Sequence, residues 1–169
     1  MKPYSLTIAC GLFAIALIGP AQAQAPQQTT ATYDDWVVRC TGAPPQKTCE
    51  IVQFTQVQGQ AGVLTQIAIG NPKKGELLKL VIQVPIDAWL PTGVKLLTAE
   101  KDPALFATFK RCVPAACFAD IELKDDAVKK FRAAAETGKL QFKDAAQKDI
   151  SLPVSFKGFG AALDAMQKE

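Results

Sequence analysis

The chain has 169 residues, with 19 Lys and Arg, 16 Asp and Glu and no histidine, which gives a formal net charge of +3 at pH 7. This near balance argues against a nucleic-acid-binding protein, because such proteins concentrate basic charge on one surface. The absence of histidine excludes Ser-His-Asp and Cys-His nucleophilic sites and weakens any proposal of a zinc or other transition-metal site. No phosphate-binding loop or dinucleotide fingerprint is present, so no cofactor is expected.

Residues 1–23 have the pattern of a secretory signal peptide. Lys2 supplies the positive start, residues 6–18 are apolar and uncharged, and Ala21-Gln22-Ala23 is a small-residue cleavage pattern. Cleavage would leave a flexible leader over residues 24–32 and a single domain over residues 33–169. The pattern therefore predicts a protein of the periplasm, with exposure on the cell surface or secretion as alternatives.

The first half of the domain is predicted to contain only strands. Trp36, Val38 and Cys40 fall on one face of the first strand, which places Trp36 in the core. Leu78, Leu80, Ile82 and Val84 share one face of the most apolar segment, which we therefore expect to be a central strand. Gly and Pro turns separate strands predicted at residues 33–40, 48–57, 63–69 and 77–84.

The second half adds two helices to the strands. Asp125 is the expected N-cap of the first helix, Gly138 its stop, and Val128, Phe131 and Ala135 its buried stripe. A short C-terminal helix is expected after Gly158, and the remaining strands at residues 94–97, 105–110, 117–123, 140–142 and 150–156. About nine short strands with two helices predict a mainly β fold, either a β-sandwich or a flattened barrel.

Four cysteines remain after the predicted cleavage, and they allow three pairings. Pairing Cys40 with Cys49 and Cys112 with Cys117 is the simplest, because each pair brackets a turn. Two other interpretations stay open. A redox-active dithiol usually has the spacing Cys-x-x-Cys at a helix start, and a four-cysteine zinc site has tighter spacings than these.

Carboxylate chemistry is the enzymatic alternative in a chain without histidine. Glycoside hydrolysis, for example, needs two acidic residues across one cleft. The candidate pairs are Asp34/Asp35, Glu100/Asp102, Asp120/Glu122 and Asp125/Asp126. Of these, Asp125/Asp126 is already explained by helix capping, and Asp120/Glu122 lies on a predicted solvent face.

Three residues are candidates for contact with a partner. Trp89 lies in a proline-flanked connector, where an exposed aromatic side chain would serve as a binding hot spot. Lys73 and Lys74 form a basic pair on a turn, suited either to plain solvation or to an anionic surface.

The order of several short motifs resembles the invasion-associated locus B proteins of the Gram-negative envelope. The resemblance covers residues 33–166 and implies a secreted, disulfide-bonded β-sandwich, linked in some pathogenic members to entry into host cells. It supplies no catalytic or ligand-binding residues. The motifs are Asp35-Trp36 with Val38 and Cys40, Cys49, residues 90–94 (Leu-Pro-Thr-Gly-Val), Cys112 and Cys117 with Ala119, a helix ending at Gly138, and residues 154–159 (Val-Ser-Phe-Lys-Gly-Phe) with Ala162.

Our first hypothesis is therefore a non-enzymatic exported protein that acts through contacts with an unknown envelope or host protein. Two alternatives stay open: a small periplasmic hydrolase that uses paired carboxylates, and a thiol–disulfide protein.

Overall fold

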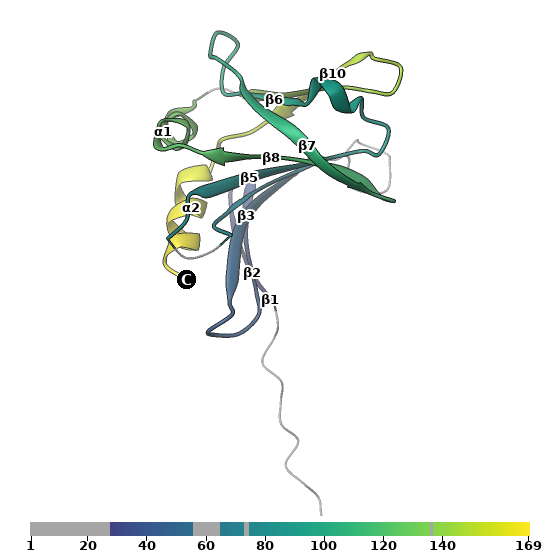
Figure 1. Ribbon diagram of the computed structural model, residues 1–169. Coiled ribbons are helices and arrows are strands. Elements are labelled where there is room, and N and C mark those ends of the chain that lie inside the picture. Colours follow the sequence, from purple (N-terminus) through teal and green to yellow (C-terminus); the bar gives the residue numbers. More distant parts are fainter. Residues whose placement is uncertain (1–27, 56–64, 73–74, 136) are drawn as a thin grey trace, which may run out of the picture.

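The computed structural model describes residues 28–55, 65–72, 75–135 and 137–169, and ten strands of these residues form one antiparallel sheet (Figure 1). The order across the sheet is β1-β2-β3-β4-β5-β8-β7-β6-β9-β10. The strands are β1 (Gln28–Tyr33), β2 (Trp36–Thr41), β3 (Thr48–Thr55), β4 (Thr65–Gly70), β5 (Leu78–Val84), β6 (Val94–Leu97), β7 (Leu105–Val113), β8 (Ala116–Leu123), β9 (Gly138–Lys143) and β10 (Asp149–Val154). The helices are η1 (Leu90–Thr92), α1 (Asp125–Ala133) and α2 (Phe159–Gln167).

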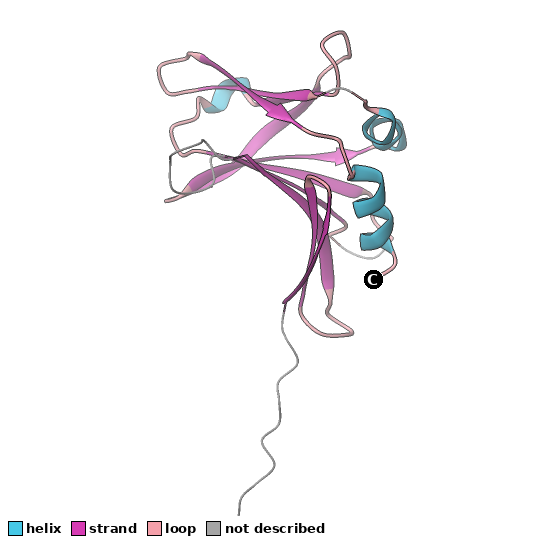
Figure 2. Ribbon diagram, turned by 180° about the vertical axis from the view of Figure 1, so that it is seen from behind, coloured by secondary structure: helices cyan, strands magenta, loops and turns pink. Residues whose placement is uncertain are grey.

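The predicted mainly β class is confirmed, but the strand count and architecture differ from the prediction. There are ten strands rather than about nine, and they form a single open sheet in which β1 and β10 are the two edges. The sheet bends at β7, which pairs with β8 on one side and with β6 on the other. As a result β6, β9 and β10 lie as a second layer over β5 and β8 (Figure 2).

The domain starts earlier than the sequence predicts. Residues 28–32 are not a free leader, because β1 pairs with β2 along its whole length, from Gln28 opposite Thr41 to Tyr33 opposite Trp36. Asp34 and Asp35 form the two-residue connection, and Asp34 has a φ of 48°. Tight hairpin turns require positive φ, which Asp tolerates better than most residues. This turn and the threonines of β1 were the signals for the missed strand.

The core lies on the inner face of the sheet, where alternate residues of each strand point. Leu78, Leu80, Ile82 and Val84 of β5 are all buried, so the prediction of their shared face is confirmed, and β5 is an interior strand. Each such side chain contributes about 1.5–3 kcal/mol by leaving water. Trp36 is 1% exposed and is a core residue, as predicted.

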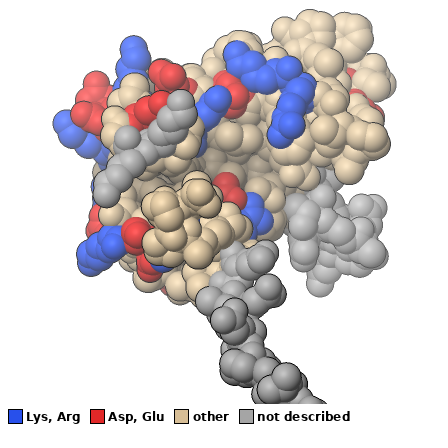
Figure 3. All heavy atoms as spheres, turned by 60° about the horizontal axis from the view of Figure 1, so that its bottom comes forward, with Lys and Arg blue, Asp and Glu red and all other residues tan. Residues whose placement is uncertain are grey.

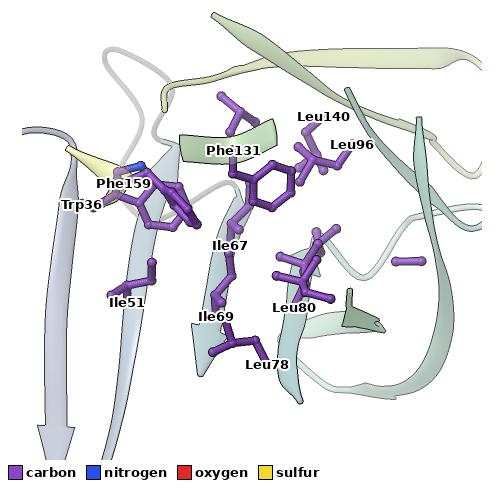
Figure 4. Close-up of a cluster of buried hydrophobic side chains, with 14 of the residues drawn as sticks. Trp36, Ile51, Ile67, Ile69, Leu78, Leu80, Leu96, Phe131, Leu140 and Phe159 are labelled. Atoms are coloured by element: carbon purple, nitrogen blue, oxygen red, sulfur yellow. The ribbon is translucent and has the colours of Figure 1, made fainter. Parts of the chain in front are cut away.

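The two helices close the inner face with an aromatic cluster (Figure 4). Phe159 of α2 packs edge-on against Trp36 of β2, with ring centroids 5.3 Å apart, and against Phe131 of α1 at 5.5 Å. Phe156 contacts the same cluster, with its ring centroid 5.0 Å from that of Phe131. These contacts attach α1 and α2 to the sheet and join the first and last parts of the domain.

The sequence prediction is also wrong at the end of α1. The helix ends at Ala133, and Ala135 lies beyond it and is exposed. Gly138 begins β9 instead of stopping the helix. A Cβ atom on Gly138 would lie 2.2 Å from the carbonyl oxygen of Leu97, so glycine is needed there for close approach to β6. Lys124 rather than Asp125 holds the N-cap position, and Asp125 lies in the first turn.

Two disulfides each tie a pair of neighbouring strands. Cys40 on β2 is bonded to Cys49 on β3, and Cys112 on β7 is bonded to Cys117 on β8. The members of each pair stand directly opposite in the strand register, with Cα atoms 4.0 Å apart. Both are therefore local bridges that close hairpins.

Candidate functional site

The first sequence motif, around Asp35-Trp36, and the last, residues 154–159, lie side by side and are joined by hydrogen bonds. The indole Nε1 of Trp36 donates to the carbonyl oxygen of Ser155 at 3.0 Å, and the Ser155 hydroxyl donates to the Asp35 carboxylate at 2.6 Å. Gly158 has a φ of 83°, and a Cβ atom on it would lie 2.1 Å from the carbonyl oxygen of Tyr33. These motif residues thus join the β1–β2 turn to the segment between β10 and α2. Their role is structural.

Gln53 of β3 belongs to the same hydrogen-bond network, and sequence analysis missed this residue. Its side chain is 7% exposed; its Nε2 donates to the carbonyl oxygen of Ser155 at 2.8 Å, and its Oε1 accepts from the Ser155 N–H at 3.0 Å. The only available signal was a polar residue placed among the apolar residues of a predicted strand. A glutamine there must find partners, because a buried unpaired amide is costly.

The middle motif, residues 90–94, forms η1 and the start of β6. The Thr92 hydroxyl donates to the carbonyl oxygen of Trp89 at 3.2 Å. A Cβ atom on Gly93 would lie 2.6 Å from the Phe106 ring, so the glycine allows that ring to cover the turn. Trp89, a predicted contact residue, is half-buried, and its backbone N–H donates to the Lys143 carbonyl oxygen at 2.7 Å.

At least one member of three of the four candidate carboxylate pairs contacts a neighbouring group, and the fourth pair, Asp125/Asp126, lies in the first turn of α1. Asp34 pairs with Lys157 at 3.2 Å, and Asp120 with Lys79 at 2.9 Å. Asp102 accepts from the Thr98 hydroxyl at 2.5 Å, and Asp35 accepts from Ser155 as described above. The residues described by the structure contain no group of three or more Cys, Asp or Glu side chains arranged to hold a metal ion.

One carboxyl group has a clearly shifted pKa, and its cause is an interhelical ion pair. The Arg132 guanidinium of α1 donates to Asp164 of α2 at 2.6 Å and lowers the pKa of that carboxyl below its usual value of 3.8. Asp164 lies on the solvent side of α2 and lines none of the three hollows described below. The pair therefore links the two helices.

An apolar surface lies around the second disulfide, at the end where the β7–β8 hairpin turns. Ile86, Leu90 and Val113 are 54%, 44% and 36% exposed. Cys112 is exposed beside them, and the Sγ atom of Cys117 lies 3.8 Å from the carbonyl oxygen of Ile86. We call Ile86, Leu90, Pro91, Val113 and the Cys112–Cys117 disulfide the apolar end.

The apolar end contains a shallow hollow with a basic rim. The hollow has a volume of about 340 Å³ and is lined by Leu90, Pro91, Phe109, Lys110, Arg111 and Cys112. Arg111 stacks on the ring of Phe118, with Cζ 5.0 Å from the centroid. This stacking holds a guanidinium in a fixed place next to exposed apolar side chains. Of the predicted contact residues, Trp89 directly precedes this surface, whereas Lys73 and Lys74 lie outside the described residues.

Two other hollows have a different character. One, of about 350 Å³, lies over Gly70 on the outer face of the sheet between the Arg39–Glu50 and Lys79–Asp120 ion pairs. Another, of about 360 Å³, lies between β8 and α1 over Leu96 and Phe131. On the face seen in Figure 3, basic and acidic residues are interspersed, with broad uncharged areas between them. In the described part of the chain, no helix is both long enough and apolar enough to cross a membrane.

Comparison with known proteins places this geometry in a family. The family model for "Invasion associated locus B (IalB) protein" matches residues 36–167. Two invasion protein B homologs of Brucella abortus, one from strain 2308 and one from biovar 1, are each 26% identical over 165 residues, which is 97% of this chain and 92% of theirs. The crystal structure of invasion associated protein B from Bartonella henselae matches with a TM-score of 0.71 at 23% identity, over 83% of this chain and 95% of that one, which shows a shared fold. The chain therefore belongs to the invasion associated locus B family.

Proposed function

We propose that this protein is exported and acts in the envelope or on the cell surface by binding another protein, without turning over a substrate. Membership of a family named for invasion supports a role outside the cytoplasm. The pattern of residues 1–23 and the two disulfides point to the same compartment, because disulfides persist in oxidising environments. The predicted signal peptide lies outside the described residues.

The observation that carries the proposal is the apolar end. Single exposed apolar residues are normal, but a group of them around a fixed arginine has the composition of an interface core. Leu90, Val113 and Ile86 supply the apolar area, and Arg111 supplies a directional charge. The disulfide restrains the hairpin before binding, which lowers the entropy cost of association. The fitting partner is a protein surface with an apolar side chain for the hollow and a carboxylate for Arg111.

Photo-crosslinking in the native cell tests this function. A photoreactive residue at position 90 or 113 should yield one recurrent protein adduct, identified by mass spectrometry. The matched control is position 77. Leu77 is 52% exposed, but it precedes β5 whereas Ile86 follows it, so the two residues lie at opposite ends of that strand. Adding Arg111→Glu to the labelled chain should remove the adduct. Equal adducts at positions 77 and 90 would contradict the proposal, as would a catalytic turnover that disappears when one carboxylate is replaced.

A further inference from the structure

The two edge strands of the sheet differ in how they are protected against further pairing. β10 contains Asp149 and Pro153, and Pro153 has no N–H to offer. Charged residues and proline are usual devices that prevent an edge strand from pairing with another chain. β1 has the sequence Gln-Thr-Thr-Ala-Thr-Tyr, with no charge and no proline, and residues 28–32 are exposed. Among the described residues β1 pairs only with β2, so its outer edge is open to a further strand.

The position of the first disulfide shows which β1 groups face outward. Cys40 and Cys49 stand opposite each other with Cα atoms 4.0 Å apart. That separation fits a non-hydrogen-bonded antiparallel pair, at about 4.5 Å, and not a hydrogen-bonded one, at about 5.5 Å. The N–H and C=O of Cys40 therefore point toward β1, where Thr29 is its partner. By alternation, the N–H and C=O groups of Gln28, Thr30 and Thr32 point away from the sheet.

These outward groups are symmetric about Thr30. In an antiparallel pair centred there, Thr30 would face Thr30 of a second copy, and Gln28 would face Thr32 in both directions. Every outward N–H would then meet a carbonyl oxygen, and no charged side chains would oppose each other. Threonine pairs across strands are favourable. We propose that β1 pairs with β1 of a second copy of this chain, joining the two sheets across a two-fold axis.

The size of this contact determines its strength. A pair of six-residue strands buries much less than the roughly 1,200 Å² of a standard interface, and contacts below that size are weak and transient. The dimer should therefore form with a dissociation constant of about 10 µM to 1 mM, and should be invisible in dilute solution.

Sedimentation velocity of the disulfide-intact protein, from about 10 µM to about 1 mM, tests the proposal over that range. Wild type and Thr30→Ala should both shift from monomer to dimer, because alanine keeps the backbone N–H. Thr30→Pro should stay monomeric while keeping the wild-type unfolding midpoint, because the N–H that it removes is not used in pairing with β2. A wild type that stays monomeric throughout, or a Thr30→Pro variant that dimerises equally, would overturn the proposal.

Cysteine crosslinking gives a second readout that does not need the proline variant to fold. Thr30→Cys should form a disulfide-linked homodimer in the native compartment, because the two Cβ atoms would face each other across the axis. The control is Ser151→Cys, an exposed position on the protected edge strand β10, which should not form one. Adducts of Thr30→Cys mainly with a different protein would overturn self-pairing and would identify the other occupant of this edge.

Discussion

Replacing Gln53 with alanine tests whether the outer motifs are structural, as the geometry indicates. The substitution removes the donor to the Ser155 carbonyl oxygen and the acceptor for the Ser155 N–H. The Ser155 carbonyl keeps its hydrogen bond from Trp36, and the lost hydrogen bond to the Asp35 carbonyl oxygen is long, at 3.4 Å, so the main loss is the partner of the Ser155 N–H. Leaving one buried group unsatisfied costs about 1–3 kcal/mol, and the cavity adds to this. We expect the free energy of unfolding to fall by about 2–4 kcal/mol.

Urea unfolding with both disulfides intact measures this change, because the linear extrapolation gives a free energy for each variant. The matched control is Gln83→Ala. Gln83 is half-buried on β5, and its side chain makes no hydrogen bond with the residues that the structure describes. It should change stability by less than about 0.5 kcal/mol. If Gln53→Ala and Gln83→Ala had equal effects, the joint between β3 and the segment after β10 would not contribute as argued.

Three further predictions address the turn, the disulfides and the helix pair. Gly158→Ala should destabilise the fold by more than about 2 kcal/mol, because the added Cβ would clash with the Tyr33 carbonyl oxygen. The control is Gly75→Ala, because Gly75 has a similar φ of 89° but no atom within 4 Å of the added Cβ. It should cost only about 1 kcal/mol in the same urea assay. Graded reduction should open the Cys112–Cys117 disulfide before the Cys40–Cys49 disulfide, because Cys112 is exposed whereas Cys40 is 3% exposed. Alkylation and peptide mass spectrometry measure the order, and simultaneous opening of the two bonds would contradict it. A bond that glutathione reduces readily would favour the thiol–disulfide function. Arg132→Gln should return the Asp164 pKa toward 3.8, which NMR titration measures, and an unchanged pKa would exclude Arg132 as the cause of the shift. Because the native pKa is lowered, the stability difference between wild type and variant should be present above pH 3.8. It should vanish as the pH falls through the native pKa of Asp164.

Sequence reasoning predicted those parts of the fold that follow from local pattern. The alternation in β5 placed Leu78 to Val84 on one buried face, and the register of Trp36 placed it in the core. The local cysteine spacing favoured hairpin bridges, which the structure contains. Each of these depends on residues within one strand or one hairpin.

The features that sequence reasoning missed depend on contacts between distant segments. Gly138 looked like a helix stop, but its reason is the approach of β9 to Leu97 on β6. Gln53 is explained by its hydrogen bonds to Ser155, which is 102 residues away in the chain, and to the carbonyl oxygen of Asp35. The bending of one sheet at β7 likewise depends on long-range pairing, and short strands in either a sandwich or a barrel would have the same local pattern.

The apolar end was found only in part from the sequence. Trp89 was singled out as the exposed aromatic of its connector, yet it is half-buried and the neighbouring Leu90 is the exposed residue. Val113 follows Cys112 in a hairpin more than twenty positions away, and only the packing of η1 near β7, which places Leu90 and Cys112 around one hollow, brings this hairpin to Leu90.

The account depends most on export and on the two bridges that export permits. Intact-mass spectrometry of the protein from its native cell fraction, alkylated without reductant, tests both together. We expect the mass of residues 24–169 with no alkylated cysteine, because the signal peptide and Cys10 are removed and the other four cysteines are paired. A mass that retains residues 1–23 and shows every cysteine alkylated would contradict the account.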